Sequence, residues 1–388
     1  MRNKRLDVLR CMAVLLVMFN HGGGDIWPGL ARKGWVGVDL FFVLSGFLIS
    51  GLLFGEYKSH GSINFGRFFI RRGLKIYPAF YAFLFLSQAV AYIAFRSTAP
   101  LAHYLPELFF VQNYWHGIWD HTWSLGVEEH FYIFLPLLLL CLLRFSSEQR
   151  DPFRILPRLF VTVAILCVFF RAISVCFAPP NYHMAYTASH NRMDALFFGV
   201  LLGYYYHFRP EILKHLMHGW RNCSIIGLGS FSLLFVTYLL PRDSSLFSTF
   251  GFTCVYLGFG GILLLSLYLQ GILRGNAARY LGLMGSAAAS VGMYSYSIYL
   301  WHGPVAAWFP GLVRRVLHVS FGANERFAVF VIGSLIVGIA MSKMIEYPIL
   351  RLRDRIFPAQ ESATIRASDV AHKEATTAPN IPAKPSSA

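Results

Sequence analysis

The chain contains about ten apolar stretches, each long enough to cross a lipid bilayer as a helix. Such a helix needs roughly 20 mainly apolar residues, because the hydrocarbon core of a bilayer is about 30 Å thick. Only 14% of the residues are charged, whereas a soluble domain has about 25%. The sequence therefore predicts an all-α, polytopic bundle of transmembrane helices. The expected spans cover residues 7–23, 35–54, 76–95, 122–143, 157–178, 193–208, 222–240, 250–270, 287–310 and 326–346.

The distribution of basic residues predicts how this bundle is oriented. Cytoplasmic loops of membrane proteins carry an excess of Lys and Arg. If the N-terminus lies inside, the inner segments hold most of the basic residues, including those within 58–75 and 144–158. We therefore expect both termini in the cytoplasm. The formal net charge of +15 then has its source in these loops and does not indicate a nucleic-acid partner.

The composition changes near the C-terminus. Residues 1–350 are expected to form one membrane domain, and residues 351–388 a cytoplasmic tail. From Pro358 onward, Ala, Thr, Lys, Pro and Ser occur without an apolar period, which is typical of disorder. The six cysteines are scattered without a C-x-x-C pair, so we expect no metal site and no disulfide framework.

The first apolar stretch carries three polar residues on one side. Arg10 and His21 are eleven residues apart, about three helical turns, so they share a face, and Asp7 lies near it. Charged groups inside a bilayer are costly and usually face a protein interior or a wet cavity. This pattern predicts a spanning helix whose polar stripe, Asp7, Arg10 and His21, faces a buried site. Alternatively, Asp7 and Arg10 pair at one membrane interface and His21 lies at the other.

Further polar residues are expected at the depth of His21 in other spans. They are Asp39, Glu128, Glu129, Arg192, Asp194 and His302. Isolated ionised groups are not tolerated at that depth, so we expect these side chains to converge on one another or on a wet pocket. Glu128 is expected to act with His21 in catalysis, and the other five are expected to bind substrate.

Several of these residues also have a purely structural interpretation. Arg192 and Asp194 can form an interfacial ion pair with each other. Glu129 can face a neighbouring basic group or water, and His302 can cap a kink at Pro304. The sequence leaves these alternatives open.

A second group of charges precedes the third expected span, in FGRFFIRRGLKIYP. If this segment is helical, Arg72 and Lys75 share one face, and Arg71 lies close to it. Arg and Lys near an interface bind phosphate groups, so the sequence predicts a site for the phosphates of a donor such as an acyl-coenzyme A. The alternative is a simple basic anchor on the cytoplasmic side.

Together, these stretches resemble one family, the integral membrane acyltransferase 3 family. Asp7, Arg10 and His21 match its D-x-x-R motif followed by a histidine, and GVDLFFVLSGFLIS is similar to its second-helix signature. FFIRRGLKIYP resembles its R-R-x-x-R-I-x-P stretch, and WSLGVEEHFY resembles W-S-L-x-x-E-x-x-F-Y, whose glutamate is Glu128 here. NRMDALFFG, SYSIYLWHGP and IEYP also correspond. The resemblance covers about residues 6–350, and it departs at Lys75, where the family usually has arginine.

The resemblance implies an O-acyltransferase that moves an acyl group, most commonly acetyl, to a hydroxyl of an exported glycan or a lipid-linked sugar. A neutral imidazole suits proton abstraction near pH 7, so His21 is the expected general base. Glu128 is expected to orient His21 or hold the acceptor, and Arg10 to orient the site, neutralise Asp7 or stabilise an oxyanion. The expected phosphate ligands are Arg71, Arg72 and Lys75.

No permanently bound cofactor is expected, because acyl-coenzyme A is a donor substrate. The expected partners are membrane lipid, the donor, a glycan or lipid-linked sugar acceptor, and a polysaccharide assembly complex. The expected location is a bacterial inner membrane, which the chain crosses several times.

Two other classes of function compete with an enzyme. A transporter of a lipid-linked sugar or an acyl donor would use polar residues near the bilayer midplane equally well. It also predicts paired repeats and interrupted spans, which we do not find in the sequence. If the protein were a structural scaffold, the presence of the polar residues His21, Arg10 and Glu128 within apolar spans would have no explanation. Within the enzyme class, direct transfer and a route through an acylated His21 both remain open.

Overall fold

The computed structural model describes residues 3–23, 28–146, 151–177, 182–268, 276–318 and 320–358. Within these ranges all regular elements are helices, as expected, and no strand occurs. The first half contains α1 (Lys4–Gly22), α2 (Pro28–Ala31), η1 (Gly34–Val36), α3 (Gly37–His60), α4 (Phe65–Phe95), η2 (Leu101–His103), α5 (Tyr104–Leu108), η3 (Asp120–Thr122), α6 (Trp123–Phe145) and α7 (Leu156–Phe177). The second half contains α8 (Tyr182–Thr187), α9 (Ser189–Phe208), α10 (Pro210–Leu216), α11 (Gly219–Leu239), η4 (Phe247–Gly251), α12 (Phe252–Tyr268), α13 (Asn276–Met293), α14 (Ser295–Leu317), α15 (Ala323–Met341), η6 (Ser342–Glu346) and α16 (Tyr347–Ile356).

Seven stretches of helix in the described ranges are long and apolar enough to cross a membrane. They begin in η1, α4, η3, α7, α11, η4 and α15. Helices α1, α9 and α14 coincide with three further expected spans; they are long enough to cross a membrane but are not among these seven apolar stretches. The finding supports a multi-pass membrane protein, because in a bilayer only helices satisfy all backbone hydrogen bonds within one segment.

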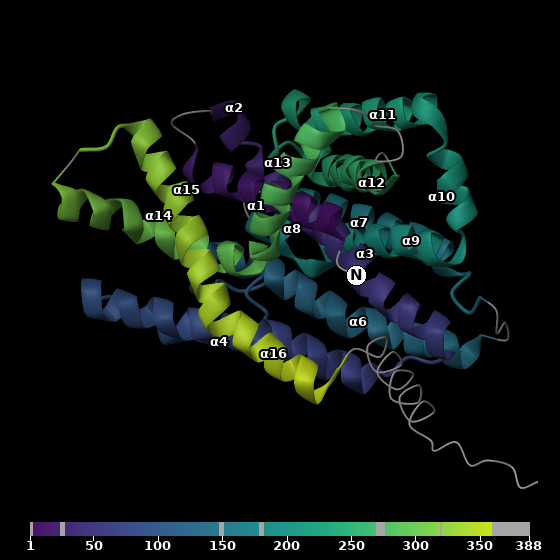
Figure 1. The fold of residues 1–388 in the computed structure, drawn as a ribbon, viewed down its shortest axis with the longest axis horizontal. Coiled ribbons are helices and arrows are strands. Elements are labelled where there is room, and N and C mark those ends of the chain that lie inside the picture. Colours follow the sequence, from purple (N-terminus) through teal and green to yellow (C-terminus); the bar gives the residue numbers. More distant parts are fainter. Residues whose placement is uncertain are drawn as a thin grey trace, which may run out of the picture.

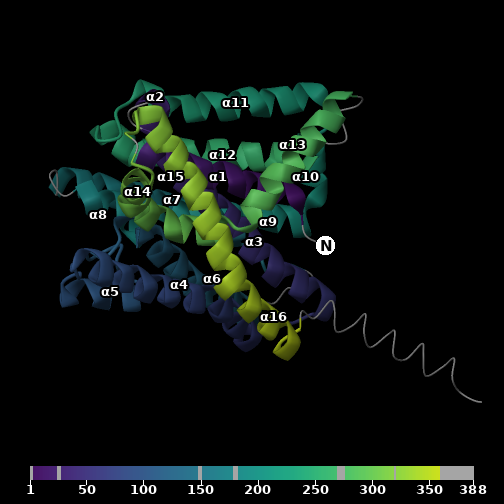
Figure 2. The same ribbon diagram turned by 60° about the vertical axis from the view of Figure 1, so that its left-hand side comes forward.

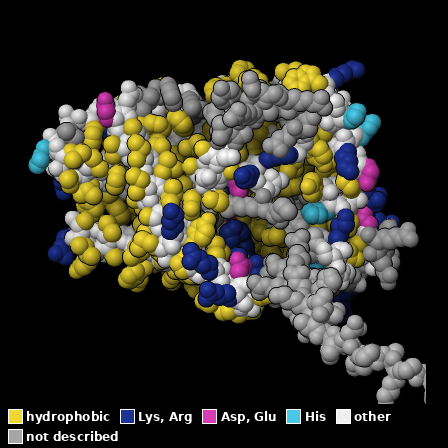
Figure 3. Space-filling view, viewed as in Figure 1, with side chains coloured by type: hydrophobic (Ala, Val, Ile, Leu, Met, Phe, Trp, Pro, Cys, Tyr) yellow, Lys and Arg dark blue, Asp and Glu magenta, His cyan; other side chains and the backbone are white. Residues whose placement is uncertain are grey.

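The outer surface of the bundle is rich in apolar side chains. Phe85, Ile93 and Phe177 are each more than 70% exposed. Figure 3 shows a largely hydrophobic area over α14 and α15, whereas Lys and Arg side chains gather near α16. Large exposed apolar areas are rare on soluble monomers and match a lipid-facing surface.

Helix α1 lies in the middle of the bundle and packs against α3, α13 and α14 (Figure 1). Val14, Val17 and Met18 of α1 are almost completely buried, and this apolar side fixes the helix in place. Since one rigid helix carries both Arg10 and His21, these side chains stand roughly 16 Å apart along its axis.

The expected ninth span is divided between two helices. Helix α13 ends at Met293 and α14 begins at Ser295, so the expected range 287–310 contains a break between two helices rather than one straight span. The amide of Tyr294 donates to the carbonyl of Val291, a tight turn that interrupts the helical ladder. The residues Met293–Ser295 include no proline or glycine that would predict this break from the sequence.

The C-terminal helices cross the bundle. Helix α15 leads through a π-helical turn, η6, into α16, which lies along α4 in Figures 1 and 2. Helix α16 therefore continues past the boundary expected at Leu350, and it ends at Ile356. Residues 359–388 of the expected tail lie outside the described residues.

Candidate active site

A pocket of about 540 Å³ opens among helices α1, α3, α4, α6, α9, α12, α13, α14 and η6. Its walls are largely apolar, with charged groups contributed by separate helices. The ionisable residues of its lining that carry charge at neutral pH in their ordinary state are Asp7, Arg10, Arg72, Lys75, Glu128, Glu129 and Glu346. A pocket of this size accommodates a substantial organic ligand. Of the residues expected to converge at the depth of His21, Glu128 and Glu129 line this pocket.

Asp7 and Arg10 of α1 meet at the wall of this pocket. The Arg10 Nη1 atom is 3.5 Å from the Asp7 Oδ1 atom, and the Asp7 side chain is almost fully buried. Their spacing of three residues places both groups on one face of the helix. The contact neutralises the buried carboxylate and leaves the guanidinium partly exposed in the pocket.

Glu128 lies beside Arg72 rather than beside His21. The Arg72 Nη2 atom is 3.9 Å from the Glu128 Oε2 atom. The Tyr132 hydroxyl donates to the same carboxylate, and the Arg72 guanidinium lies 3.8 Å from the centre of the Tyr132 ring. Among the described residues, the partners of the Glu128 carboxylate include Arg72 and Tyr132, and no hydrogen bond or ion pair joins it to His21. Arg72 lies inside α4 and reaches the pocket, whereas the basic segment was expected before the span.

Glu129 has a different partner. The Tyr77 hydroxyl of α4 donates to its Oε2 atom over 3.1 Å. Glu129 also lines the pocket, so it faces polar groups within the bundle. Both glutamates of the WSLGVEE stretch therefore attach α6 to α4, one through an arginine and one through a tyrosine.

The three basic residues expected to hold phosphates do not act as one group. Arg72 and Lys75 line the pocket. Arg71 instead contacts α16, where its Nη2 atom is 3.0 Å from the Asp354 Oδ1 atom and its Nη1 atom donates to the Phe357 carbonyl. Arg71 therefore holds the C-terminal helix, and only Arg72 and Lys75 are placed to meet a ligand in the pocket.

Glu346, in the IEYP stretch, was not among the expected site residues. The hydroxyls of Ser297 and Ser342 both donate to its Oε2 atom over 2.8 Å. The π-helical turn of η6 directs this carboxylate into the pocket. Its position in a motif at the end of the last span was the only sequence signal.

A group of three histidines lies at the other end of α1. The ring centre of His302 is 4.9 Å from that of His21 and 4.6 Å from that of His121. His21 lies at the surface, whereas His302 and His121 are buried. The structure therefore brings His302 next to His21, as expected from their similar depth. His121 was not expected, although it stands directly before the W-S-L motif.

Tyr299 separates the histidines from the pocket. Its hydroxyl donates to the His121 carbonyl over 2.6 Å and lies 2.6 Å from the Ser124 hydroxyl. Its ring centre is 5.4 Å from that of His302. Since Tyr299 and Ser124 also line the pocket, the pocket and the histidine group share a wall.

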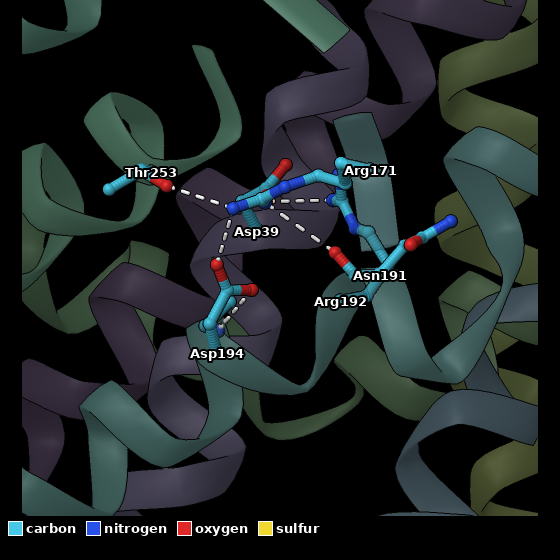
Figure 4. Close-up of polar contacts among 7 residues, drawn as sticks. Asp39, Arg171, Asn191, Arg192, Asp194 and Thr253 are labelled. Atoms are coloured by element: carbon cyan, nitrogen blue, oxygen red, sulfur yellow. Dashed lines mark hydrogen bonds and ion pairs between the residues drawn. The ribbon is translucent and has the colours of Figure 1, made fainter. Parts of the chain in front are cut away.

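Asp39, Arg192 and Asp194 belong to a separate buried ionic network, which Figure 4 shows. The Arg192 Nη2 atom is 2.7 Å from Asp39 Oδ1, and the Arg171 Nη2 atom is 2.8 Å from Asp194 Oδ2. All four side chains are about 1% exposed. Arg192 and Asp194 thus do not pair with each other, and none of the three expected residues lines the pocket. Arg171, from α7, was missing from the expected set.

This network joins four helices. Thr253 of α12 accepts a hydrogen bond from Arg171 over 2.9 Å, and the Arg192 guanidinium lies 4.1 Å from the Phe252 ring centre. Buried charges require such pairing, and they fix the relative positions of the elements that supply them. The contacts of Asp39, Arg192 and Asp194 assign them to the packing of α3, α7, α9 and α12.

Outside the spanning helices, a buried carboxylate holds the loop before His121. Glu107 Oε1 accepts hydrogen bonds from the amides of Ile118 and Trp119 and from the Thr122 hydroxyl. Burial raises the pKa of Glu107 to about 7, although these hydrogen bonds favour the charged form. Within the described residues, no group of three or more His, Cys, Asp or Glu is arranged to hold a metal ion.

Comparison with known proteins gives this geometry a family. A family model described as an acyltransferase domain matches residues 3–343. A protein of Staphylococcus aureus (strain COL) named as an O-acetyltransferase, SACOL0978, is 27% identical over 325 residues, which cover 78% of this chain and 50% of that protein. The O-acetyltransferase OatA of S. aureus (strain NCTC 8325 / PS 47) is 26% identical over 320 residues, which cover 77% of this chain and 50% of OatA.

The chain therefore spans about half the length of the curated relatives that it matches. No solved structure matches it. The family match includes all the helices that line the pocket and the histidine group, apart from the end of η6. The chain belongs to the integral membrane acyltransferase 3 family.

Proposed function

We propose that this protein is a membrane-embedded O-acyltransferase. It moves an acyl group, an acetyl group in the main case, from cytoplasmic acyl-coenzyme A to a hydroxyl of an exported glycan or a lipid-linked sugar. The observation that carries this proposal is the wall shared by the charged pocket and the histidine group at Tyr299. A donor held in the pocket can present its reactive end at this wall, and an acceptor can approach the exposed His21 from the opposite side.

The pocket supplies the donor site. Arg72 and Lys75 offer positive charge to the phosphates of coenzyme A, and Arg10 lies further along the same pocket. The distance of roughly 16 Å between Arg10 and His21 along α1 suits a donor with a phosphorylated head and a long, thin arm. Lys75 provides charge without the bidentate geometry of arginine, so Arg72 is the principal phosphate ligand in this proposal.

His21 supplies the base. Its Nδ1 atom donates to the Val17 carbonyl over 2.9 Å, which leaves the lone pair on Nε2 free to accept a proton. In direct transfer, Nε2 takes the proton of the acceptor hydroxyl, and the hydroxyl oxygen attacks the thioester carbonyl carbon. The carbon–sulfur bond then breaks, and the thiolate of coenzyme A receives the proton.

The cellular setting follows from the same scheme. Coenzyme A thioesters are cytoplasmic, so the pocket and both termini face the cytoplasm, in a bacterial inner membrane. The acceptor is then reached from the outer side, where a polysaccharide assembly complex would deliver it. The name of OatA supports acetyl as the transferred group and oxygen as the receiving atom.

Transfer of label from radioactive acetyl-coenzyme A in membranes that carry the glycan acceptor tests this proposal. Wild type is compared with His21→Ala at matched expression, and the expected loss of rate is about 10²-fold to 10⁴-fold. His60→Ala is a control, because His60 contacts the carbonyl four residues earlier, as His21 does, but lies at the far end of α3.

Two results would contradict the proposal at different points. If His21→Ala transfers label at the wild-type rate, another group is the base, and the assignment of His21 is wrong. If wild-type membranes form no ester but carry labelled donor or lipid-linked sugar across the bilayer, the protein is a transporter.

A further inference from the structure

The three histidine rings have fixed hydrogen-bonding roles. His302 Nδ1 is 2.6 Å from the Tyr299 carbonyl, and His121 Nε2 is 3.1 Å from the Leu300 carbonyl. A carbonyl oxygen only accepts, so each of these nitrogens carries a hydrogen, as Nδ1 of His21 does. In the neutral rings the remaining nitrogens therefore present lone pairs: Nε2 of His21, Nε2 of His302 and Nδ1 of His121.

The lone pair of His302 is distinctive. Its side chain is fully buried, and its Nε2 atom has no hydrogen-bond partner among the described residues. A buried acceptor without a donor costs free energy, so its retention calls for a function. The adjacent ring of His21 becomes a donor at Nε2 when it takes up a proton.

One charged side chain among the described residues, Asp120, acts on a protonated His21 ring beside the other histidines. From α14, Tyr299 faces His302 with its ring and directs its hydroxyl elsewhere. From η3, the neutral His121 and the carboxylate of Asp120 are near, and Asp120 interacts electrostatically with His21. Helix α15 presents Phe327 and Phe330 next to Gly22, and α4 presents Phe83 next to His121.

We propose that His302 is a positioning residue that acts through His21, accepting a hydrogen bond at its buried Nε2 atom when His21 becomes an imidazolium. The inference rests on the proposed function, in which His21 removes the proton of the acceptor hydroxyl. The O–H bond breaks, the His21 Nε2–H bond forms, and the proton is shared between the two rings. It then returns from His21 to the thiolate of coenzyme A, so no further reactant is required.

The pair carries one proton and not two. Two imidazolium ions with ring centres 4.9 Å apart would repel each other strongly, because the ring of His302 is fully buried. The uptake of one proton is therefore a property of both rings together. His302 stabilises the state of the enzyme that exists only after proton transfer, so its loss affects the rate of the chemical step and not the binding of the donor.

The variant His302→Asn tests this role. An asparagine amide can still donate to the Tyr299 carbonyl, but it has no nitrogen lone pair that accepts a proton. With acetyl-coenzyme A as donor and methyl glucoside as a simple hydroxyl acceptor, we expect kcat to fall about tenfold to hundredfold at an unchanged KM for the donor. The acidic limb of the pH profile is expected to move to lower pH, because the imidazolium has lost its acceptor. His60→Asn is the matched control, with no change in either quantity.

Nitrogen NMR of ¹⁵N-histidine-labelled protein in detergent gives a second test that needs no activity. We expect the signals of His21 and His302 to change together in one titration step, and the step of His21 to move to lower pH in His302→Asn. A His302 signal that stays constant while His21 titrates, with the same midpoint in the variant, overturns the inference. If wild type transfers no acyl group, the proposed function fails, while this NMR result still decides whether the two rings share a proton.

Discussion

Arg71 and Arg72 are neighbours in the sequence, but the structure gives them different partners. Arg72 faces the pocket, and Arg71 binds Asp354 of α16. Hydrogen bonds to charged groups contribute about 1.5–3 kcal/mol each, so Arg72→Ala is expected to raise the KM for acetyl-coenzyme A about tenfold to hundredfold. Arg71→Ala is expected to change this KM less than threefold, because its guanidinium does not reach the pocket. Steady-state kinetics on the two variants measures the difference.

Two further variants make this comparison specific. The Arg72→Ala variant leaves the Glu128 carboxylate without its basic partner. In the double variant Arg72→Ala/Glu128→Gln, position 128 carries no charge, so a raised KM in this variant reports the loss of phosphate binding and not an unpaired carboxylate. Lys75→Arg restores the arginine that the family usually has, whose guanidinium can bind phosphate through two hydrogen bonds. It is expected to lower the KM for acetyl-coenzyme A. A larger KM effect for Arg71→Ala than for Arg72→Ala would show that the donor site lies at α16 and not in the pocket.

The carboxyl of Glu107 makes the stability of the protein dependent on pH. Its pKa is raised by burial to about 7, so between about pH 4.5 and pH 7 the folded protein holds more protons than the unfolded chain. The free energy of unfolding therefore falls as pH rises through this window, by an amount on the order of 3 kcal/mol. In Glu107→Gln, which cannot ionise, the midpoint of thermal unfolding in detergent is expected to lose this dependence.

The side-chain amide oxygen introduced by Glu107→Gln can still accept the hydrogen bonds that Oε1 accepts from Ile118, Trp119 and Thr122. The comparison therefore isolates the charge and keeps the loop contacts. Glu107→Gln is expected to be more stable than wild type at pH 8 and similar to it at pH 5. The opposite order at pH 8 would mean that the ionised carboxylate stabilises the loop.

At the scale of helices, the packing of α3 against α9 depends on small residues. A Cβ atom on Gly46 would overlap the Leu196 carbonyl, and one on Gly199 would overlap the Val43 carbonyl. Backbone atoms cannot rotate away as side chains can, so Gly46→Ala is expected to lower the free energy of unfolding by about 1–3 kcal/mol or more. Gly55→Ala in the same helix meets no atom within 4 Å and is the control. Equal thermal stability of the two variants would contradict the close packing of α3 against α9 at Gly46.

The sequence predicted this architecture because apolar length and low charge leave few options other than membrane helices. It also predicted that Arg10 and His21 share a face, since one helix fixes both positions. It did not predict the contact between Glu128 and Arg72, because the basic segment was expected before the span, whereas α4 begins at Phe65 and carries Arg72 into the pocket. It missed Arg171, because a single arginine within an apolar span gives no indication of its partner on another helix.

On the scale of the whole molecule, α1 connects two chemically different regions. Its first turns border a pocket with both signs of charge, and its last turn carries His21 of the histidine group. In the proposed reaction, the pocket for the anionic donor and the base His21 lie on opposite sides of Tyr299, so donor and acceptor would approach from opposite sides of the membrane. This arrangement has a function only if the pocket faces the compartment that contains the donor.

The orientation of the bundle is therefore a prediction that the basic loops and the proposed reaction make independently. In a cysteine-free variant, Ser59→Cys probes the end of α3, and Thr98→Cys probes the segment after α4; both residues are exposed. The Lys and Arg excess places Ser59 inside and Thr98 outside. A membrane-impermeant maleimide applied to intact cells is thus expected to label Thr98→Cys at once and Ser59→Cys only after permeabilisation. The reverse pattern would place the pocket outside, where coenzyme A thioesters are absent, and would reject acyl-coenzyme A as the donor even if acyl transfer were observed.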